Sequence, residues 1–395
     1  MKNISENHIF KNHKKLKEVS VILLEALIIA GLVLFSLGPI SCKVTAEGIR
    51  MLDGDYVPPV LQGFSVTDSN TLTMIFSEEV TLNGCVLSPF IEDISDSMES
   101  SRTEELSEAL AAASGAYGSI NVQVEYEAEK TVLLIRLEEE METGKKYEFY
   151  GTVKDRIGNT LTFAIPFTGY NARIPKIIMT EIQSETISSQ KASEKLDGSY
   201  RTEFVEFLAL SDGNLAGLEL CSGYDGAARN YVFPAVEVSQ GEVFVVHLRN
   251  KGNGCVSENE DNLALAFGTY TNPSVRDLWS QESGTALGNK TDVVIVRNQA
   301  DGKVMDAFFY AAEGTEKWQK SMEEYAFLAS EYEIYPSAGV EEAFVTTGLT
   351  ASKTIIRKNA AELLEKAILE GEIEYPVKAA DCLWAVSNEA SPGQL

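Results

Sequence analysis

The order of apolar and polar positions divides the chain into an N-terminal apolar stretch and a long remainder of short, strand-like runs. The apolar stretch covers residues 19–42 and follows a lysine-rich start. From residue 57 onward, short runs either alternate apolar and polar side chains or are apolar throughout, and polar turns separate them. Such runs are typical of β-strands, and their spacing is typical of antiparallel sheets. The pattern therefore predicts an all-β protein after the N-terminal stretch.

The first group of predicted strands lies within residues 57–170. These strands are residues 61–66, 71–76, 122–126, 131–137 and 147–153. In the second of them, leucine, methionine and phenylalanine alternate with threonine and isoleucine, so one face of the sheet can be buried. A short helix is predicted over residues 101–114, because Ser101–Glu104 resembles a capping box.

A second group of predicted strands begins after Ile174-Pro175. It consists of residues 176–183, 203–208, 212–220 (a turn and a strand), 231–234, 240–248, 292–297 and 304–310. Asp301-Gly302, between the last two runs, is a hairpin signal. The spacing of these strands again favours antiparallel pairing.

Two helices are predicted after the last hairpin. The first, over residues 315–332, carries a stripe of aromatic and apolar side chains at helical spacing. The stripe consists of Trp318, Met322, Tyr325, Ala329 and Tyr332. We expect it to pack into the core, and a partner-binding groove is the alternative. The second helix covers residues 359–370, with Gly371 as its expected C-cap. Its inward-facing residues are predicted to be Leu363, Leu364, Ala367 and Ile368.

The N-terminal apolar stretch has the features of an export signal. An unbroken apolar run from Ala26 to Phe35 follows the lysines, and Gly38–Cys42 then supplies small residues and a cysteine. A cysteine at the cleavage site indicates a bacterial lipoprotein, with residues 1–41 as signal peptide and Cys42 as the lipidated residue. Pro39 stands where lipoproteins usually carry leucine, and an uncleaved membrane helix is the alternative. Both interpretations make the membrane a partner and place the rest of the chain outside the cytoplasm, after a polar tether at residues 43–56.

The net charge and the few histidines argue against several partners and types of active site. The net charge of −26 argues against nucleic acid as a direct partner, because phosphate backbones are repelled. Two of the three histidines lie before Cys42, which leaves only His247, in a predicted strand. We expect this lone histidine to be structural, so Ser-His-Asp chemistry and multi-histidine metal sites have little support. The remaining cysteines could form two disulfides or stay free thiols. They are Cys85, Cys221, Cys255 and Cys382.

Three motifs within residues 57–170 are Pro58-Pro59, Val66–Ser77 and Gly151–Asn159. With them the region resembles the bacterial Ig-like domains of surface-layer and other envelope proteins. The resemblance implies that Asp155, Gly158 and Asn159 form the turn between the last two strands. A plain turn is expected, because glycine accepts positive φ and Asp or Asn bonds nearby backbone. A calcium role for Asp155 is the alternative.

A second series of motifs runs through residues 174–395. It includes the strand Glu203–Glu206, the turn Leu215–Leu220, the strand Gly241–Val246 and the closing Ser391–Gly393. In this order the motifs resemble the lamin tail domain, an Ig-like β-sandwich of nuclear lamins and exported bacterial proteins. The resemblance implies structural roles for nine residues. They are Glu181, Glu203, Glu206, Gly217, Pro234, Arg357, Trp384, Pro392 and Gly393. The chain departs from the family in a long connection at residues 251–291 and in the helices before the closing motif.

Few residues suggest catalysis or metal binding. Glu203 and Glu206 could be taken for an acid–base pair, but residues three apart on a strand point to opposite faces. Hydrogen-bonding roles are expected instead, and Glu181 could approach one of them from a neighbouring strand. The loop at residues 257–262 carries calcium-type ligands without EF-hand spacing, and we expect a solvated loop. The sequence contains no P-loop, GxSxG or HExxH motif.

Together these patterns predict two Ig-like β-sandwiches in series, at residues 57–170 and 174–395, the second with inserted helices. The expected function is binding or scaffolding in the bacterial cell envelope by a lipid-anchored, non-catalytic protein. A protein or an envelope polymer is the expected partner, and no cofactor or metal is expected. The alternatives are an accessory protein of an exported hydrolase or nuclease system, and a cryptic metal-dependent hydrolase.

Overall fold

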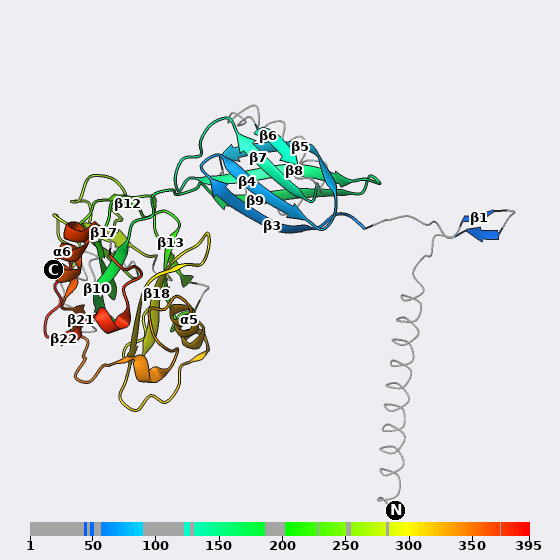
Figure 1. Ribbon diagram of the computed structural model, residues 1–395. Helices are drawn as coiled ribbons and strands as arrows, with labels where there is room; N and C mark the ends of the chain where they lie inside the picture. Colours follow the sequence, from blue (N-terminus) through cyan, green and yellow to red (C-terminus); the bar gives the residue numbers. More distant parts are fainter. Residues whose placement is uncertain are drawn as a thin grey trace, which may run out of the picture. The chain divides into compact units, whose positions relative to one another are not determined.

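The computed structural model describes residues 43–45, 48–50, 57–89, 122–126, 130–185, 202–226, 229–249, 254–281, 284–371 and 373–395. These residues are mainly β, with two short α-helices near the C-terminus (Figure 1). The prediction of a mainly β protein is confirmed at this level. The predicted signal peptide, Cys42 and the predicted helix at residues 101–114 lie outside the described residues. In the described part of the chain, no helix has the length and apolar character that crossing a membrane requires.

The chain divides into two units after Val57. In the first unit, β1 (Lys43–Thr45) and β2 (Gly48–Arg50) form an antiparallel pair. This pair lies within the segment that the sequence predicts to be a polar tether.

Two antiparallel sheets lie at the start of the second unit. The four-stranded sheet, in the order β3-β4-β7-β6, consists of β3 (Leu61–Asp68), β4 (Thr71–Phe76), β7 (Val132–Leu137) and β6 (Val122–Tyr126). The three-stranded sheet consists of β5 (Val80–Pro89), β8 (Lys146–Asp155) and β9 (Thr160–Thr168), in that order. One hydrophobic cluster contains buried residues of both sheets, among them Leu72 and Phe149. The hydrophobic pattern alone does not mark β5 and β9, because Asn83-Gly84 interrupts the first and Pro166 the second. The predicted turn at Asp155–Asn159 nevertheless implies a strand where β9 lies.

Two larger sheets follow. The six-stranded sheet has the order β17-β16-β11-β10-β21-β22. Its strands are β10 (Ile177–Gln183), β11 (Phe204–Ala209), β16 (Val243–His247), β17 (Arg276–Trp279), β21 (Thr354–Arg357) and β22 (Trp384–Ser387). The five-stranded sheet has the order β14-β13-β18-β19-β20. Its strands are β13 (Leu218–Ser222), β14 (Tyr231–Val232), β18 (Asp292–Asn298), β19 (Val304–Ala311) and β20 (Phe344–Val345). A short pair, β12 (Gly213–Asn214) and β15 (Glu237–Val238), accompanies them.

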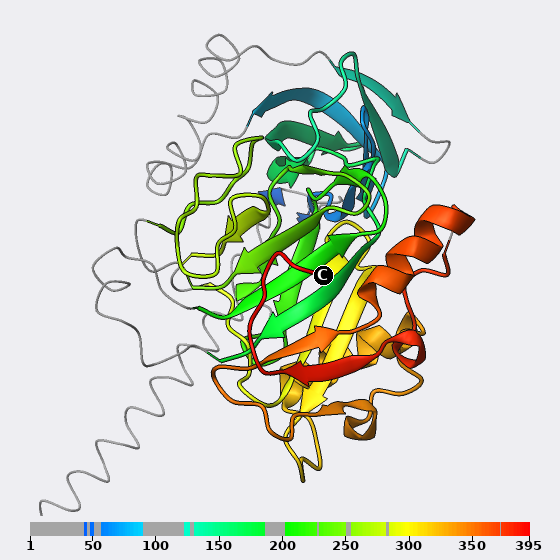
Figure 2. The same ribbon diagram turned by 90° about the vertical axis from the view of Figure 1, so that its left-hand side faces the viewer.

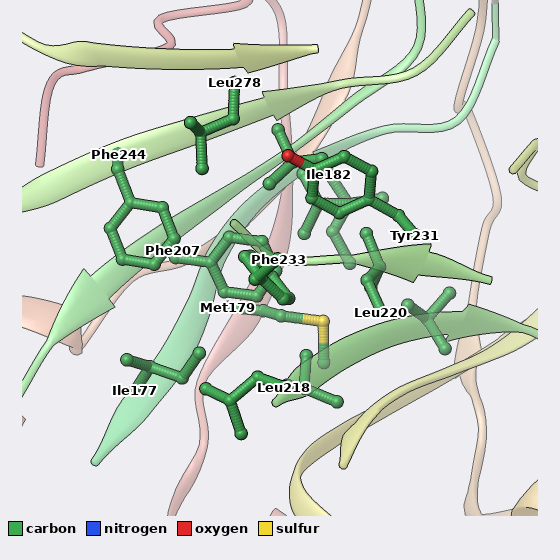
Figure 3. Packing of buried hydrophobic residues seen from close by; sticks show 14 of the residues in the cluster. Ile177, Met179, Ile182, Phe207, Leu218, Leu220, Tyr231, Phe233, Phe244 and Leu278 are labelled. Atoms are coloured by element: carbon green, nitrogen blue, oxygen red, sulfur yellow. The ribbon is translucent and has the colours of Figure 1, made fainter. Parts of the chain in front are cut away.

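The largest hydrophobic core lies between these two sheets. Met179, Phe207 and Phe244 of the six-stranded sheet share one cluster with Leu218 and Leu220 of the five-stranded sheet (Figure 3). All five side chains are fully buried. The predicted hairpin at Asp301-Gly302 is confirmed, because β18 and β19 pair antiparallel around Gly302, whose φ is +72°.

The two helices cover different sheets. Helix α5 (Lys320–Glu331) packs on β18 and β19. Four residues of the predicted stripe belong to a buried cluster there, and Tyr332, just after the helix, is partly buried against it. Helix α6 (Ala360–Glu370) packs through Ala367 on residues of β10 and β11, and Gly371 ends it with a φ of +69°. The prediction that Ile368 points inward is wrong: its side chain is 56% exposed, because the contact is restricted to one narrow face of α6.

Candidate functional site

A bulge in β10 places two glutamates of the predicted set side by side. The pairing of β10 with β11 runs Met179 to Phe207 and then Glu181 to Glu206, so Thr180 is the extra residue. Without a bulge, Glu181 would lie on the same face as Met179 and Ile182 would not. With it, Met179 and Ile182 both reach the core between the sheets. Glu181 is thereby free to share the opposite face with Glu206.

The C-terminal segment is bonded to this glutamate pair. The backbone N–H of Ser391 donates to Glu181 Oε1 at 3.1 Å, and its hydroxyl donates to Glu181 Oε2 at 3.1 Å. Glu206 accepts the backbone N–H of Gly393 at 2.5 Å and the hydroxyl of Thr180 at 2.5 Å. Figure 2 shows the C-terminal segment, in red, crossing the green strands of the sheet. The closing Ser-Pro-Gly motif is therefore held by two carboxyl groups that lie 210 and 187 residues earlier in the chain.

Burial of the pair changes its protonation. Both glutamates are 1% exposed. Burial, with a smaller contribution from the neighbouring Glu181 charge, raises the pKa of Glu206 to about 7, against hydrogen bonds from Thr180 and Gly393 that lower it. Burial also raises the pKa of Glu181, against hydrogen bonds from Thr354 and Ser391. A carboxyl group with a pKa near neutrality, as Glu206 has, can hold or release a proton. A substrate could reach it only if the C-terminal segment left.

A buried ion pair that includes Arg357 links the two larger sheets. The Arg357 guanidinium, on β21, bonds both carboxylate oxygens of Asp306, on β19, at 3.0 and 2.8 Å. Asp306 also accepts the backbone N–H of Met179, and Arg357 lies 4.7 Å from the ring centre of Trp384. Burial alone would lower the pKa of Arg357, but the Asp306 carboxylate outweighs it and raises that pKa. The sequence prediction includes Arg357 and Trp384 but misses Asp306, the residue that links them to the other sheet.

Glu203 and Glu206 are not brought together. Glu203 precedes β11 and accepts the backbone N–H of Leu287 at 2.9 Å, with Arg249 Nε at 3.4 Å. Glu206 bonds the C-terminal segment instead. The two carboxyl groups therefore have separate partners and separate tasks.

His247 belongs to a buried aromatic stack. Its Nε2 lies 2.6 Å from Asp277 Oδ1, and its ring stacks on Trp279 with centroids 4.3 Å apart. His247 is fully buried and Asp277 is 1% exposed, so neither reaches solvent. The sequence prediction does not include Asp277. Val275, Leu278 and Trp279 are the apolar residues near it, and Arg276 and Asp277 interrupt them, so the sequence gives little sign of this strand.

The predicted turn residues hold turns. The Asp155 carboxylate accepts three backbone N–H groups, those of Ile157, Gly158 and Asn159, and the Asn159 side-chain amide. Burial alone would raise the pKa of Asp155, but these four hydrogen bonds outweigh it and lower that pKa. Gly158 has a φ of +109°, which suits glycine. These bonds occupy the oxygens that a calcium ion would need.

Two other predicted residues also lie in turns of the second pair of sheets. Gly217 has a φ of +83°, and the Pro234 carbonyl accepts the backbone N–H of Val236 at 2.9 Å.

The acidic loop at residues 257–262 folds around an arginine. The Glu258 carboxylate points inward and accepts the backbone N–H groups of Leu265, Ala266 and Asp277. The Arg276 guanidinium bonds the backbone carbonyls of Glu258 and Glu260. Arg276 therefore takes two backbone carbonyls of the loop, and Asn259, Glu260, Asp261 and Asn262 are exposed to solvent. Among the described residues, no group of three or more His, Cys, Asp or Glu side chains could hold a metal ion, and the four cysteines there form no disulfide.

Comparison with known proteins gives a family but no activity. An uncharacterized protein of Treponema pallidum (strain Nichols) is 28% identical over 223 residues, which are 55% of this chain and 53% of that protein. The chain thus spans about half the length of this relative.

Solved structures offer only weak likenesses. A DUF4876 family protein from Bacteroides thetaiotaomicron matches with a TM-score of 0.26 and 10% identity, over 70% of this chain and 82% of that one. The N-terminal part of the bacterial S-layer protein SbsC matches with a TM-score of 0.21 and 12% identity, over 65% and 44%. At these TM-scores the likenesses carry no inference, and the resemblance to bacterial Ig-like and lamin tail domains stays a prediction. Residues 175–386, more than half of the chain, match the model of a family described as "protein second domain", and the chain belongs to that family.

Proposed function

We propose that this protein is a lipid-anchored, non-catalytic component of the bacterial cell envelope that binds or scaffolds another envelope component. Its folded part would be two Ig-like β-sandwiches in series, at residues 57–170 and 174–395. Two observations support this arrangement: each pair of sheets shares one hydrophobic cluster, and the strands within the sheets are mostly antiparallel. The export signal and Cys42 support the anchor.

One observation carries the non-catalytic part of the proposal. The ionisable groups that the sequence nominates are bonded to the protein's own backbone and side chains. Glu206 and Glu181 hold the C-terminal segment, Glu203 holds Leu287, and His247 is enclosed by Asp277 and Trp279. A general acid or base must reach a proton on the substrate, and each of these groups is at most 3% exposed. Their arrangement favours a structural task over a hydrolytic one.

The anchor is tested by a Cys42→Ser variant of the full chain. If Cys42 is lipidated, the wild-type protein partitions into the detergent phase of a phase-separation experiment and the variant into the aqueous phase. A mass spectrum of the mature N-terminus should show the acylated cysteine. Retention of the variant in the membrane fraction would instead support an uncleaved helix.

The binding part is tested with residues 43–395 immobilised and exposed to solubilised envelope extract. We expect a partner whose capture saturates and is competed by soluble residues 43–395. An unrelated β-protein of similar net charge is the control, because an acidic surface alone attracts cationic proteins. Capture that is equal on both supports would contradict a specific binding function.

A further inference from the structure

The two edges of the six-stranded sheet differ in what covers them. At one edge, neighbouring loop residues bond β17: the Glu258 N–H donates to the Asp277 carbonyl at 2.9 Å, and the Trp279 N–H donates to Ser257 Oγ at 2.8 Å. The other edge is β22, which pairs with β21 on one side. In the described ranges of the chain, no strand pairs with the outer side of β22. Among the described elements, this edge is therefore available for pairing.

The register of β22 shows which of its backbone groups point outward. The Lys358 N–H donates to the Leu383 carbonyl at 2.7 Å, one step beyond the ladder that joins β21 and β22. Along an antiparallel ladder, hydrogen-bonded pairs alternate with non-bonded pairs. Every second residue counted from Leu383 therefore bonds β21, whereas Trp384 and Val386 direct their N–H and C=O groups away from it. Outside the ladder, neither backbone forms a hydrogen bond with any described residue.

Strand β22 also lacks the features that usually keep a sheet edge from pairing. Natural edge strands are protected by charged side chains, by proline or by a bulge. The sequence of β22 is Trp-Ala-Val-Ser, and its register with β21 is unbroken. All four residues are partly exposed. A further strand could therefore approach without displacing a charge or straightening a bulge.

A cavity of about 520 Å³ lies beside this edge, between β22 and the edge strand β20 of the other large sheet. Phe344 of β20, Leu383 and Trp384 line it, and solvent reaches all three: Leu383 is 58% exposed and the other two are partly exposed. Trp384 and Val386 pack against the core between the sheets. In an added antiparallel strand, the residues opposite these two would point to the same side. Their side chains would thus be directed toward the cavity.

We propose that β22 binds an extended peptide segment as an additional antiparallel strand, with large apolar side chains of that segment in the cavity beside β20. In strand addition, backbone hydrogen bonds supply affinity and a pocket selects alternate side chains. The net charge of −26 favours a segment whose other residues are basic, and it opposes pairing with a second copy of this chain. This assignment rests on the proposed binding function and gives it one class of partner.

The test uses the pentapeptide Lys-Phe-Lys-Phe-Lys-amide, with a fluorophore on its N-terminus, titrated with residues 43–395 and followed by fluorescence anisotropy. Unlabelled acetylated peptides then compete with it. In the proposed pairing, the phenylalanine N–H groups point to β22 and the lysine N–H groups point to solvent. N-methylation of both phenylalanines should therefore weaken competition at least about tenfold, whereas N-methylation of two lysines should leave it unchanged. The permuted peptide Lys-Lys-Lys-Phe-Phe-amide controls for charge and should also compete at least about tenfold more weakly.

Variants of the protein locate the peptide on this edge. Val386→Pro removes an outward N–H but no bond to β21, so it should weaken binding at least about tenfold. Val386→Ala keeps that N–H and is the matched control. Leu383→Gln changes an exposed residue of the cavity, so it tests the site even if Val386→Pro disturbs the fold. It should weaken binding about threefold or more, while Leu369→Gln, at a 76% exposed position of α6, should not.

Three results would overturn the proposal. The first is no saturable binding of the peptide at concentrations of residues 43–395 up to about 200 μM. The second is equal competition by the two methylated peptides, because strand pairing requires the phenylalanine N–H groups. The third is a dimer in light scattering that Val386→Pro dissociates, because a second copy would then occupy β22. In each case, equal capture of an envelope partner by the wild type and Val386→Pro would still support the proposed binding function.

Discussion

Replacing Glu206 by glutamine removes an ionisable proton from the sheet face while keeping the size of the side chain. The amide oxygen can still accept the Gly393 N–H, and the amide N–H₂ can donate to the Thr180 hydroxyl, as a protonated carboxyl group would. The variant therefore imitates the neutral form of Glu206 at every pH. Its stability relative to the wild type measures what the negative charge does in this buried position.

The size and the direction of this stability difference follow from the pKa of Glu206, which rises from its ordinary value of 4.5 to about 7 in the folded protein. Between these values the folded state binds more protons than the unfolded state, so stability falls as pH rises. The contribution of Glu206 is fully present below pH 4.5 and is lost as pH rises through about 7. At about 1.4 kcal/mol for each pH unit, the wild type should lose roughly 3 kcal/mol between pH 5 and pH 8 that Glu206→Gln retains.

Urea unfolding at pH 5, 6, 7 and 8 measures this difference. All three tryptophans lie between Trp279 and Trp384, so their fluorescence reports unfolding of the second pair of sheets. Glu316→Gln is the matched control, because Glu316 is exposed, and its stability should follow the wild type at each pH. If the free energy of unfolding changed with pH in the same way for the wild type and Glu206→Gln, the reasoning would be refuted. So would a wild type that gains stability relative to Glu206→Gln as pH rises.

Three other predictions concern the closing motif and the cysteines. Gly393→Ala should raise hydrogen exchange in the C-terminal segment, because the φ of Gly393 is +84° and an added Cβ would lie 2.9 Å from Val275. Gly348→Ala is the control for backbone strain alone, because Gly348 has a φ of +80° and an added Cβ there would meet no other atom within 4 Å. Arg357→Gln should reduce the free energy of unfolding by about 3–5 kcal/mol, since it leaves Asp306 buried without its cation. Adding Asp306→Asn to this variant should recover part of the loss, as measured by urea unfolding. If the double variant instead loses the sum of the two single losses, the ion pair would be contradicted. A thiol assay of unfolded, unreduced residues 43–395 should find four thiols in each chain, and a smaller number would reveal disulfides.

The parts of the fold that periodicity marks could be predicted from the sequence. Strand β4 alternates between apolar and polar residues, and its predicted bounds match the observed ones. The stripe at and around α5 repeats at helical spacing, and Trp318, Met322, Tyr325 and Ala329 are buried. Helix α6 was predicted with too wide an apolar face, because composition cannot tell how deeply a helix settles on a sheet. Ile368 is exposed for that reason.

The sequence allows Glu181 to approach Glu203 or Glu206 from a neighbouring strand, but it does not show which of the two, because the pairing depends on a one-residue bulge. Strand β10 is buried on both faces, so its residues show no alternation that would reveal the bulge at Thr180. The order of motifs in the lamin tail resemblance named Glu181, Glu206 and Gly393. It did not show that the two carboxyl groups face each other, or that the C-terminal segment bonds to both.

Some buried carboxyl groups are not marked by the sequence at all. Asp292 is fully buried and accepts the Ser222 hydroxyl and the backbone N–H groups of Tyr224, Gly288 and Val293. Burial raises its pKa to about 6, although these hydrogen bonds lower it. Carboxyl groups that collect the N–H groups of loops recur at Asp155 and Glu258. The donors to Asp155 are its neighbours in the chain, so the sequence predicts that turn, whereas Ser222 and Tyr224 lie 70 and 68 residues from Asp292 and leave no local sign of its role.

The proposal that this protein is not an enzyme is tested most directly by assaying purified residues 43–395 for hydrolysis. The substrates are nucleic acids, phosphoesters, peptides and glycans, each with and without added Ca²⁺, Mg²⁺ or Zn²⁺. We predict no turnover above the buffer rate, because Glu181, Glu206 and His247 are buried and bonded within the protein. Reproducible hydrolysis that disappears in Glu206→Gln or His247→Ala, with both variants shown to be folded, would contradict this prediction and establish an enzyme.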